Sequence, residues 1–124
     1  ISENDGSLAL RIDGLSRSIL LTGDLETLGE LRLGSQAVGQ VDILKLGHHG
    51  SRTSTSDPLL GLVTPAIAVV SLGLENRYGF PHDPVVKRLV NRHIPLFRTD
   101  RHGLIRVKLD GPDPIELPSL PTGP

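Results

Sequence analysis

A chain of 124 residues is long enough for one globular domain and too short for two comfortable ones. The absence of cysteine and methionine excludes disulfides, thiolate zinc sites and thioether ligands, so any metal must be bound by His, Asp, Glu or backbone oxygen. A formal net charge of -1 provides no overall positive field, so DNA binding would depend on local Lys and Arg clusters. One Tyr and two Phe argue against a platform of aromatic rings that stacks nucleobases.

The hydrophobic pattern also limits the class of protein. No apolar stretch approaches the roughly 20 residues needed to span a bilayer, and residues 1–5 lack the features of a signal peptide. We therefore expect the chain as given to be soluble. It begins without Met and directly before a predicted strand, which suggests a fragment of a longer protein.

The first predicted elements are a β-hairpin and a helix. Apolar and polar residues alternate over 8–12, and an apolar run follows at 18–21, so the two predict a hairpin with an Asp-Gly turn. A helix follows, with Asp24 as its N-cap and Gly34 as its end. Its buried face is expected to carry three leucines at helical spacing, Leu25, Leu28 and Leu31.

The next part of the chain continues with strands and helices in alternation. Strands are predicted at 41–46 and 66–71, because both runs are apolar. An Asp-Pro pair opens each of two helices, one over 57–63 and one from residue 83, because Asp is a good N-cap and Pro suits the first helical position.

The last predicted elements are two terminal strands, over 96–98 and 104–109, joined across residues 100–103. Residues 118–124 form a Pro-rich tail. The alternation along the whole chain predicts an α/β fold, with helices that flank a mixed β-sheet.

Candidate chemistry follows two of the predicted strands. Asp24 comes directly after the strand at 18–21, and His48 and His49 follow the strand at 41–46. Open α/β sheets place their sites at the carboxyl ends of strands, and a carboxylate with an imidazole suits a divalent metal. Adjacent residues of an extended segment point to opposite sides, so we expect only one of the two histidines to bind the ion.

Each candidate also has a structural interpretation. An Asp directly before a helix is most often a simple N-cap, which would leave Asp24 without a chemical role. Histidines at the end of a strand often bond backbone carbonyls, so His48 and His49 could equally stabilise a turn. Position alone leaves both alternatives open.

Four segments together resemble a known family. They are LLTGDLE at 20–26, LKLGHHGSRTS at 44–54, NRYGFPH at 76–82 and RTDRHG at 98–103. In this order they are similar to successive motifs of the metallo-β-lactamase-like domain of ComEC competence proteins, and the resemblance extends to residue 109. It implies that residues 1–117 form the C-terminal half of the αββα metallo-β-lactamase fold, followed by the tail at 118–124.

The resemblance also implies roles for four residues. Asp24 matches the family's Asp after a Thr-Gly turn, which bridges two metal ions, and His49 matches the later histidine ligand. His48 would contact a phosphate or move a proton. His82 would stabilise charge that develops on a phosphoryl oxygen, although an exposed histidine before a helix remains an alternative for it.

The family's first metal motif, His-x-His-x-Asp-His, is absent from this sequence. Asp24 and His49 alone should bind zinc or manganese weakly, because catalytic sites need three or four protein ligands. We therefore expect this chain alone to be inactive. Either the missing half precedes Ile1 in a longer protein or the chain is a truncated remnant, and the sequence does not separate these explanations.

For the longer protein, the resemblance implies a Zn- or Mn-dependent nuclease that acts in DNA uptake. This domain would be joined to a channel domain in the cell membrane and lie on its extracytoplasmic side. Ser51, Arg52 and Arg77 are the expected substrate contacts, since guanidinium groups match phosphate oxygens. The same chemistry applies to Arg98 and Arg101, although surface charge explains these two better.

Two other functions remain open. The chain could be a non-catalytic α/β module that positions DNA or a protein partner, or a phosphoesterase or lactonase that acts on small molecules. Since half a domain would expose the sheet face that its other half covers, we also expect self-association. His93 and His102 are expected to have structural or solvent-exposed roles.

Overall fold

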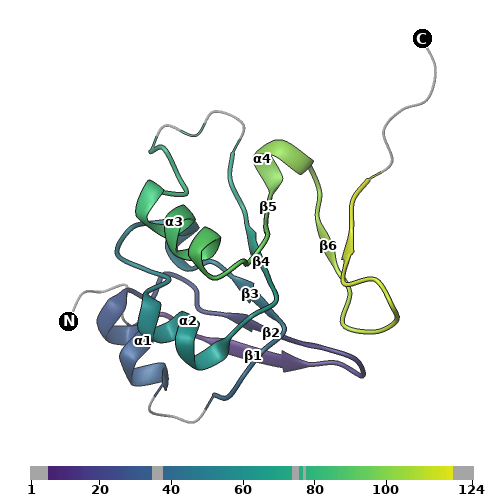
Figure 1. Ribbon diagram of the computed structural model, residues 1–124, viewed down its shortest axis with the longest axis horizontal. Helices are drawn as coiled ribbons and strands as arrows, with labels where there is room; N and C mark the ends of the chain where they lie inside the picture. Colours follow the sequence, from purple (N-terminus) through teal and green to yellow (C-terminus); the bar gives the residue numbers. More distant parts are fainter. Residues whose placement is uncertain (1–5, 35–37, 74–75, 77, 119–124) are drawn as a thin grey trace.

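The structure is a computed structural model that describes residues 6–34, 38–73, 76 and 78–118. Its centre is a sheet of five strands in sequential order. Strand β1 is antiparallel to β2, and the four strands from β2 to β5 are parallel (Figure 1). The strands are β1 (Leu10–Asp13), β2 (Ser18–Leu21), β3 (Ile43–Lys45), β4 (Ile67–Val70) and β5 (Leu96–Arg98). The predicted α/β class, the mixed sheet and the hairpin are confirmed.

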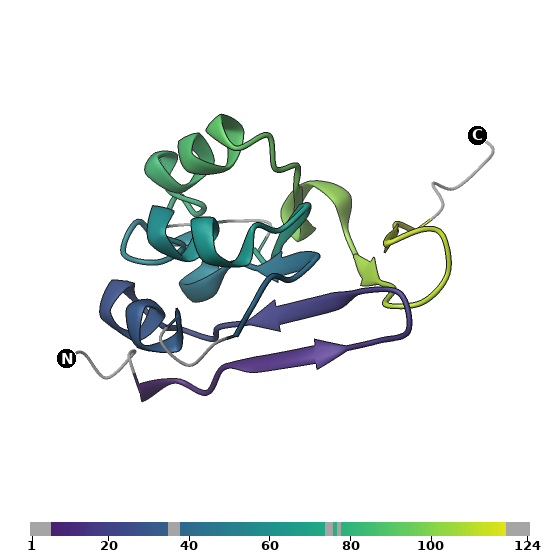
Figure 2. The same cartoon turned by 60° about the horizontal axis from the view of Figure 1, so that its bottom comes forward.

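Three helices connect the parallel strands: α1 (Thr27–Gly34), α2 (Asp57–Val63) and α3 (Asp83–Asn91). They lie on one face of the sheet (Figures 1 and 2). This arrangement follows from the strand order, because right-handed crossovers that all step in the same direction return to the same face. None of the helices in the described ranges combines the length and apolar character needed to cross a membrane.

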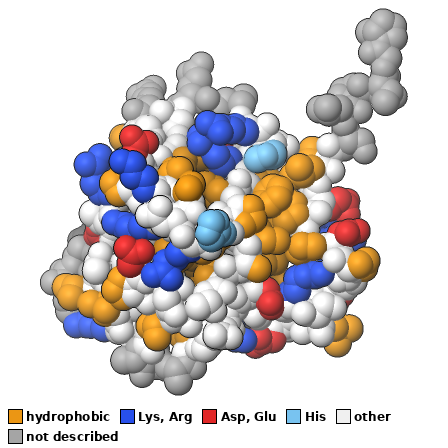
Figure 3. All heavy atoms as spheres, viewed as in Figure 1, with side chains coloured by type: hydrophobic (Ala, Val, Ile, Leu, Met, Phe, Trp, Pro, Cys, Tyr) orange, Lys and Arg blue, Asp and Glu red, His pale blue; other side chains and the backbone are white. Residues whose placement is uncertain are grey.

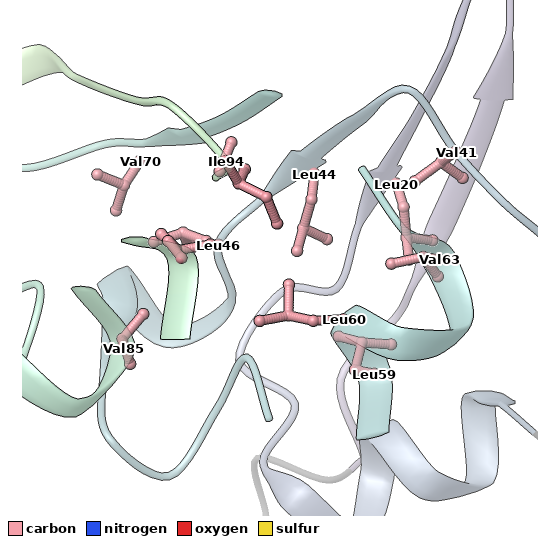
Figure 4. Packing of buried hydrophobic residues seen from close by; sticks show 12 residues of the cluster. Leu20, Val41, Leu44, Leu46, Leu59, Leu60, Val63, Val70, Val85 and Ile94 are labelled. Carbon is pink, nitrogen blue, oxygen red and sulfur yellow. The ribbon is translucent and has the colours of Figure 1, made fainter. Parts of the chain in front are cut away.

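The main hydrophobic core lies between this face and the helices. Leu20 and Leu44 of the sheet are buried with Leu60 of α2, and Figure 4 shows the three side chains pointing into the same space. Val85 and Leu89 extend this core to α3. Leu, Ile, Val and Ala side chains make up the whole cluster, as expected for a chain with so few aromatic residues.

The opposite face of the sheet carries a second apolar cluster. Ile19, Ile43 and Val69 are buried there, next to apolar side chains of the C-terminal segment. That segment contains the short helix α4 (Thr99–His102) and a separate antiparallel pair, β6 (Arg106–Val107) and β7 (Ile115–Glu116). The predicted strand at 104–109 is thus shorter than expected and pairs with β7, which the sequence pattern did not indicate.

Two helix starts differ from the prediction. The N-cap of α2 is Ser56, whose hydroxyl accepts a hydrogen bond from Leu59 N at 3.4 Å, and the N-cap of α3 is His82. Asp57 and Asp83 are instead the first helical residues, where a carboxylate still favours the positive end of the helix dipole. Pro suits this position in both cases.

The predicted buried face of α1 is wrong. The helix begins at Thr27, so Asp24 is not its N-cap. Leu25 is buried as predicted but lies before the helix, whereas Leu28 and Leu31 are exposed. The buried residues of α1 are Gly29 and Glu30. The spacing of the leucines predicted the wrong buried side, because a polar interaction determines which side of the helix faces inward.

That interaction joins Glu30 to the turn before α2. Its two carboxylate oxygens accept hydrogen bonds from Thr55 N at 2.5 Å and Ser56 N at 2.9 Å. Burial raises the pKa of Glu30 above its usual value, while the bonds from Ser56 and Thr55 oppose this shift. Arg88 of α3 donates to the carbonyls of Ser54 and Thr55, so the turn is held from two helices.

Replacing Glu30 by Gln should lower the free energy of unfolding by about 1–3 kcal/mol, because the amide NH₂ then faces a buried N–H. A raised folded-state pKa means that Glu30 contributes most stability below its unfolded pKa and loses this contribution as pH rises through the folded value. The difference between wild type and variant should therefore shrink as pH rises from the ordinary glutamate value of 4.5 through the raised folded-state pKa. Urea denaturation measures this, with exposed Asp113→Asn as control. An unchanged stability, or a difference that grows with pH, would contradict the assignment.

The second apolar face also predicts self-association. Leu10 and Ile12 are paired with Leu21 and Ile19, so all four side chains lie on this face of the sheet. The C-terminal segment covers part of the face, and in the space-filling view hydrophobic side chains remain visible between β5 and β6 (Figure 3). Contiguous apolar surface of this kind favours association between copies of the chain.

The double variant Leu10→Lys/Ile12→Lys should shift the chain toward monomer in analytical sedimentation, because it adds charge to this face. A matched control is Leu28→Lys/Leu31→Lys on α1, since these leucines are 53% and 48% exposed, compared with 49% and 46% for Leu10 and Ile12. A wild-type chain that sediments as a stable monomer would refute self-association.

Candidate functional site

The candidate residues lie at one edge of the sheet. Strands β2 to β5 are parallel, so their carboxyl ends meet there. The Thr22–Asp24 turn follows β2, and the 3-10 turn η2 (Gly47–Gly50) follows β3. Both segments therefore lie where the sequence placed them.

The geometry of η2 corrects one expectation. His48 and His49 both have positive φ, of 49° and 55°, so the pair is not extended and does not point to opposite sides. Both imidazoles instead lie beside Phe80, with ring centroids at 6.3 and 6.0 Å. Non-glycine residues rarely adopt this conformation, and two in succession indicate a turn that its surroundings hold in place.

The turn of Asp24 packs directly against η2. The backbone N–H of His48 donates to the carbonyl of Gly23 at 2.9 Å. The backbones are so close that a Cβ added at Gly47 would lie 2.7 Å from the hydroxyl of Thr22. Asp24 itself is exposed, next to this contact.

The two histidines differ in the state of their ring nitrogens. His48 Nδ1 and the hydroxyl of Thr22 are both buried, and neither has a hydrogen-bond partner among the described residues. His49 is exposed, and its Nδ1 lies 3.3 Å from the carbonyl of Ser71 after β4. A buried ring nitrogen without a partner is unusual, so the bonding capacity of His48 Nδ1 is not used within the described residues.

His82 joins the next loop to the same site. Its backbone N–H donates to the carbonyl of Gly50 at 2.9 Å. Its ring Nδ1 lies 3.0 Å from the backbone N–H of Arg52, and its Nε2 lies 3.1 Å from the carbonyl of Tyr78. Because the Arg52 N–H can only donate, this arrangement assigns the neutral tautomer, in which Nε2 carries the proton.

The expected substrate contacts have different environments. Ser51 is buried, and its hydroxyl is 3.0 Å from that of Thr53, so it stabilises the turn from inside. Arg52 is exposed, and its guanidinium Nε is 3.4 Å from Nδ1 of His82. Arg77 lies outside the described residues.

The loop after β5 is held by its own ion pair. The guanidinium group of Arg98 donates a hydrogen bond of 2.7 Å to the carboxylate of Asp100. Hydrogen bonding to Arg98 holds the pKa of Asp100 below its usual value. The ring Nδ1 of His102 accepts a hydrogen bond from the backbone N–H of Arg98 at 3.0 Å, so His102 has a structural contact. His93 is exposed, with φ of 57°, just after α3.

These positions do not yet make a metal site. Among the described residues, no three or more His, Asp or Glu side chains are arranged so that they could hold an ion together. Asp24, His48 and His49 belong to adjoining turns, but a catalytic metal needs about three protein ligands and an open position.

An aromatic residue without an assigned role occupies the centre of the site. Phe80 is surrounded by the rings of Tyr78, His48, His49 and His82, with centroid distances of 4.7–6.3 Å. A cavity of about 480 Å³ opens beside Phe80, at the carboxyl ends of β3 and β4. Phe80 belongs to the NRYGFPH segment at 76–82, which the sequence analysis identified as a motif. That motif assigned no role to its two aromatic residues.

Three proteins are similar to this chain over most of its length. Recombination protein 2 of Haemophilus influenzae is 39% identical over 86% of the chain. The ComE operon protein 3 of Bacillus subtilis is 38% identical over 86%, and the Competence protein ComA of Neisseria gonorrhoeae is 40% identical over 88%. The chain is related to a segment of competence proteins. It spans 13–16% of the length of these relatives, and no protein-family model matches it.

The packing of Gly50 gives a direct test of the site. Gly50 and Gly79 both have positive φ, so alanine is strained at each by roughly 1–2 kcal/mol. At Gly50 the new Cβ would lie 2.5 Å from Pro81, whereas no atom of the described residues beyond the two chain neighbours lies within 4 Å of a Cβ added at Gly79. Gly50→Ala should therefore cost a further 1–3 kcal/mol or so, and shift the ring resonances of His82.

Urea denaturation and the ring NMR signals of His82 measure the two effects, with Gly79→Ala as the matched control. Equal effects of the two substitutions would show that η2 does not pack against the Pro81–His82 segment as described.

Proposed function

We propose that this chain forms part of a metal-dependent hydrolase domain that cleaves phosphodiester bonds in DNA during natural competence. The observation that carries the proposal is the contact between the Asp24 turn and η2, where His48 N–H donates to Gly23. That contact brings a carboxylate loop and an imidazole loop to the carboxyl edge of parallel strands, where α/β enzymes place their sites. The similarity to competence proteins supports DNA as the substrate.

Asp24 and His49 are the proposed ligands of a zinc or manganese ion. Both side chains are exposed at this edge, and carboxylate and imidazole are suitable donors for either metal. The described residues do not hold an ion by themselves, since no group of three ligands is present. We therefore propose that the remaining ligands belong to the longer protein, and that this chain alone binds metal weakly and is inactive.

The other proposed contacts lie around these two ligands. His48 has a buried ring nitrogen without a partner, which supports a role in contacting a phosphate or moving a proton. Arg52 is exposed beside His82, so its guanidinium group is available to a phosphate oxygen. In the neutral form of His82 described here, both ring nitrogens bond to backbone groups. To stabilise phosphoryl charge directly, the His82 ring would have to break its hydrogen bonds to the backbone of Arg52 and Tyr78.

The longer protein supplies the proposed setting. We propose that this domain is joined to a channel domain in the cell membrane, lies on its extracytoplasmic side, and acts on DNA during uptake. The relatives are about six to eight times longer than the matched segment, because the match covers 13–16% of their length. A membrane domain of the same polypeptide has room in that remainder.

One observation favours a second candidate. The lack of a three-ligand group among the described residues fits a non-catalytic α/β module that positions DNA or a protein partner. In the complete protein, the double variant Asp24→Ala/His49→Ala distinguishes the two. A hydrolase loses metal-dependent cleavage, whereas a positioning module keeps whatever cleavage the protein has. Assays of DNA beside small phosphodiesters and lactones separate a nuclease from a small-molecule phosphoesterase or lactonase.

Calorimetric titration of manganese and of zinc into the chain tests the proposed ligands. Saturable binding should be lost in Asp24→Ala/His49→Ala and retained in Asp113→Ala/His93→Ala, which removes an exposed Asp and an exposed His outside the site. Equal binding by the two variants would show that Asp24 and His49 do not bind the ion.

A further inference from the structure

The cavity beside Phe80 has features that the proposed metal ligands do not explain. It measures about 480 Å³ and lies between the loops that follow β3 and β4 and the segment around Phe80. Its described lining is partly aromatic and partly polar: His49, Ser71, Leu72, Gly73, Asn76, Tyr78 and Phe80. A concave site with flat apolar walls and a few polar groups is typical of a small-ligand pocket.

Tyr78 is the unusual member of this lining. The residue is 73% exposed, although tyrosine normally buries much of its ring. The ring lies 5.6 Å from that of Phe80 at an angle of 31°, and the ring of His49 lies 6.0 Å from that of Phe80 at an angle of 27°. The chain has only one Tyr and two Phe, and two of these three residues are gathered here.

The backbone that carries these rings is held by several hydrogen bonds. The side-chain amide of Asn76 donates to the carbonyl of Phe80 and accepts from its N–H. The carbonyl of Tyr78 accepts from the His82 ring, and Gly79 N–H donates to the carbonyl of Asn76 at 3.3 Å. A fixed backbone lowers the entropy lost when a ligand binds, so the rings form a prepared surface.

A nucleobase matches this combination of groups. It offers a flat aromatic face to Tyr78 and polar edge atoms to the groups that line the cavity, such as Ser71 and Asn76. Because the cavity adjoins His49, a base placed in it leaves its own sugar-phosphate beside the proposed ligand. A base in duplex DNA would first have to leave its stack, which costs a few kcal/mol, so single-stranded DNA is favoured.

We propose that this cavity binds one unpaired nucleobase of single-stranded DNA, stacked on Tyr78. The inference rests on the proposed function for the choice of DNA as ligand, and it adds a preference for single strands and a residue that determines it. Stacking on one aromatic residue contributes roughly 1–3 kcal/mol per base. Loss of the ring should therefore weaken binding by roughly 5- to 150-fold.

Tyr78 also provides the signal for the test. It is the only tyrosine in a chain without tryptophan, so tyrosine emission reports on this ring alone. Titration with a short oligothymidylate should quench the emission. The same oligonucleotide with abasic sugars in place of the nucleosides keeps the phosphates but lacks bases, and it should bind more weakly and leave the emission unchanged.

Variants then separate base stacking from non-specific binding. Binding is measured by the fluorescence anisotropy of a labelled oligothymidylate. Tyr78→Ala should weaken binding by the stated factor, and Tyr78→Phe should restore it, since the ring is kept. Leu104→Ala is the control, because Leu104 is a similarly exposed apolar residue, at 68%, outside the cavity. Duplex DNA of the same sequence should bind more weakly than the single strand.

The outcomes distinguish this inference from the proposed function. Equal binding of the base-containing and abasic strands, no binding of either, or an equal effect of Tyr78→Ala and Leu104→Ala would overturn the base pocket. Base-dependent quenching in the chain, combined with cleavage in the complete protein that survives Asp24→Ala/His49→Ala, would leave the pocket standing and overturn the proposed function.

Discussion

The site depends first on the direction in which the chain crosses its sheet. Strands β2 to β5 are parallel neighbours in sequential order, and each helix returns the chain across the same face. This places every loop that follows a parallel strand at one edge, however far apart the loops are in sequence. The Asp24 turn, η2 and the segment after β4 thus become neighbours, and the hydrogen bond from His48 to Gly23 joins the first two. Local packing then refines an arrangement that topology has already set.

The same constraint determines what is left uncovered. With all three crossover helices on one face, the described part of the chain covers the other face with the β6–β7 segment alone, and Leu10 and Ile12 remain exposed. The strand pattern nevertheless places apolar side chains on both faces, as in a sheet that is covered on both sides. The main hydrophobic core fills the space under the helices, whereas the second face has apolar surface available for association.

Much of the fold could be predicted because hydrophobic periodicity changes clearly between strands and helices, and because Asp-Pro pairs mark two helix starts. The orientation of α1 could not, because Glu30 is buried by hydrogen bonds to a turn far along the chain. The left-handed backbone conformation of His48 and His49 could not be predicted either, since neither residue favours that conformation by itself. Counting aromatic residues argued against base stacking, but a count contains no information on where Tyr78 and Phe80 lie.

The central claim is that the Asp24 turn, η2 and the His82 segment form one site. Manganese added in small amounts broadens the NMR signals of nearby backbone amides and so reports which segments surround the ion. We predict that amides of Thr22–Asp24, Gly47–Gly50 and Tyr78–His82 broaden together, while those of β6 and β7 stay sharp. Broadening confined to the acidic loop between β6 and β7, or spread evenly over the chain, would contradict a shared site at this edge.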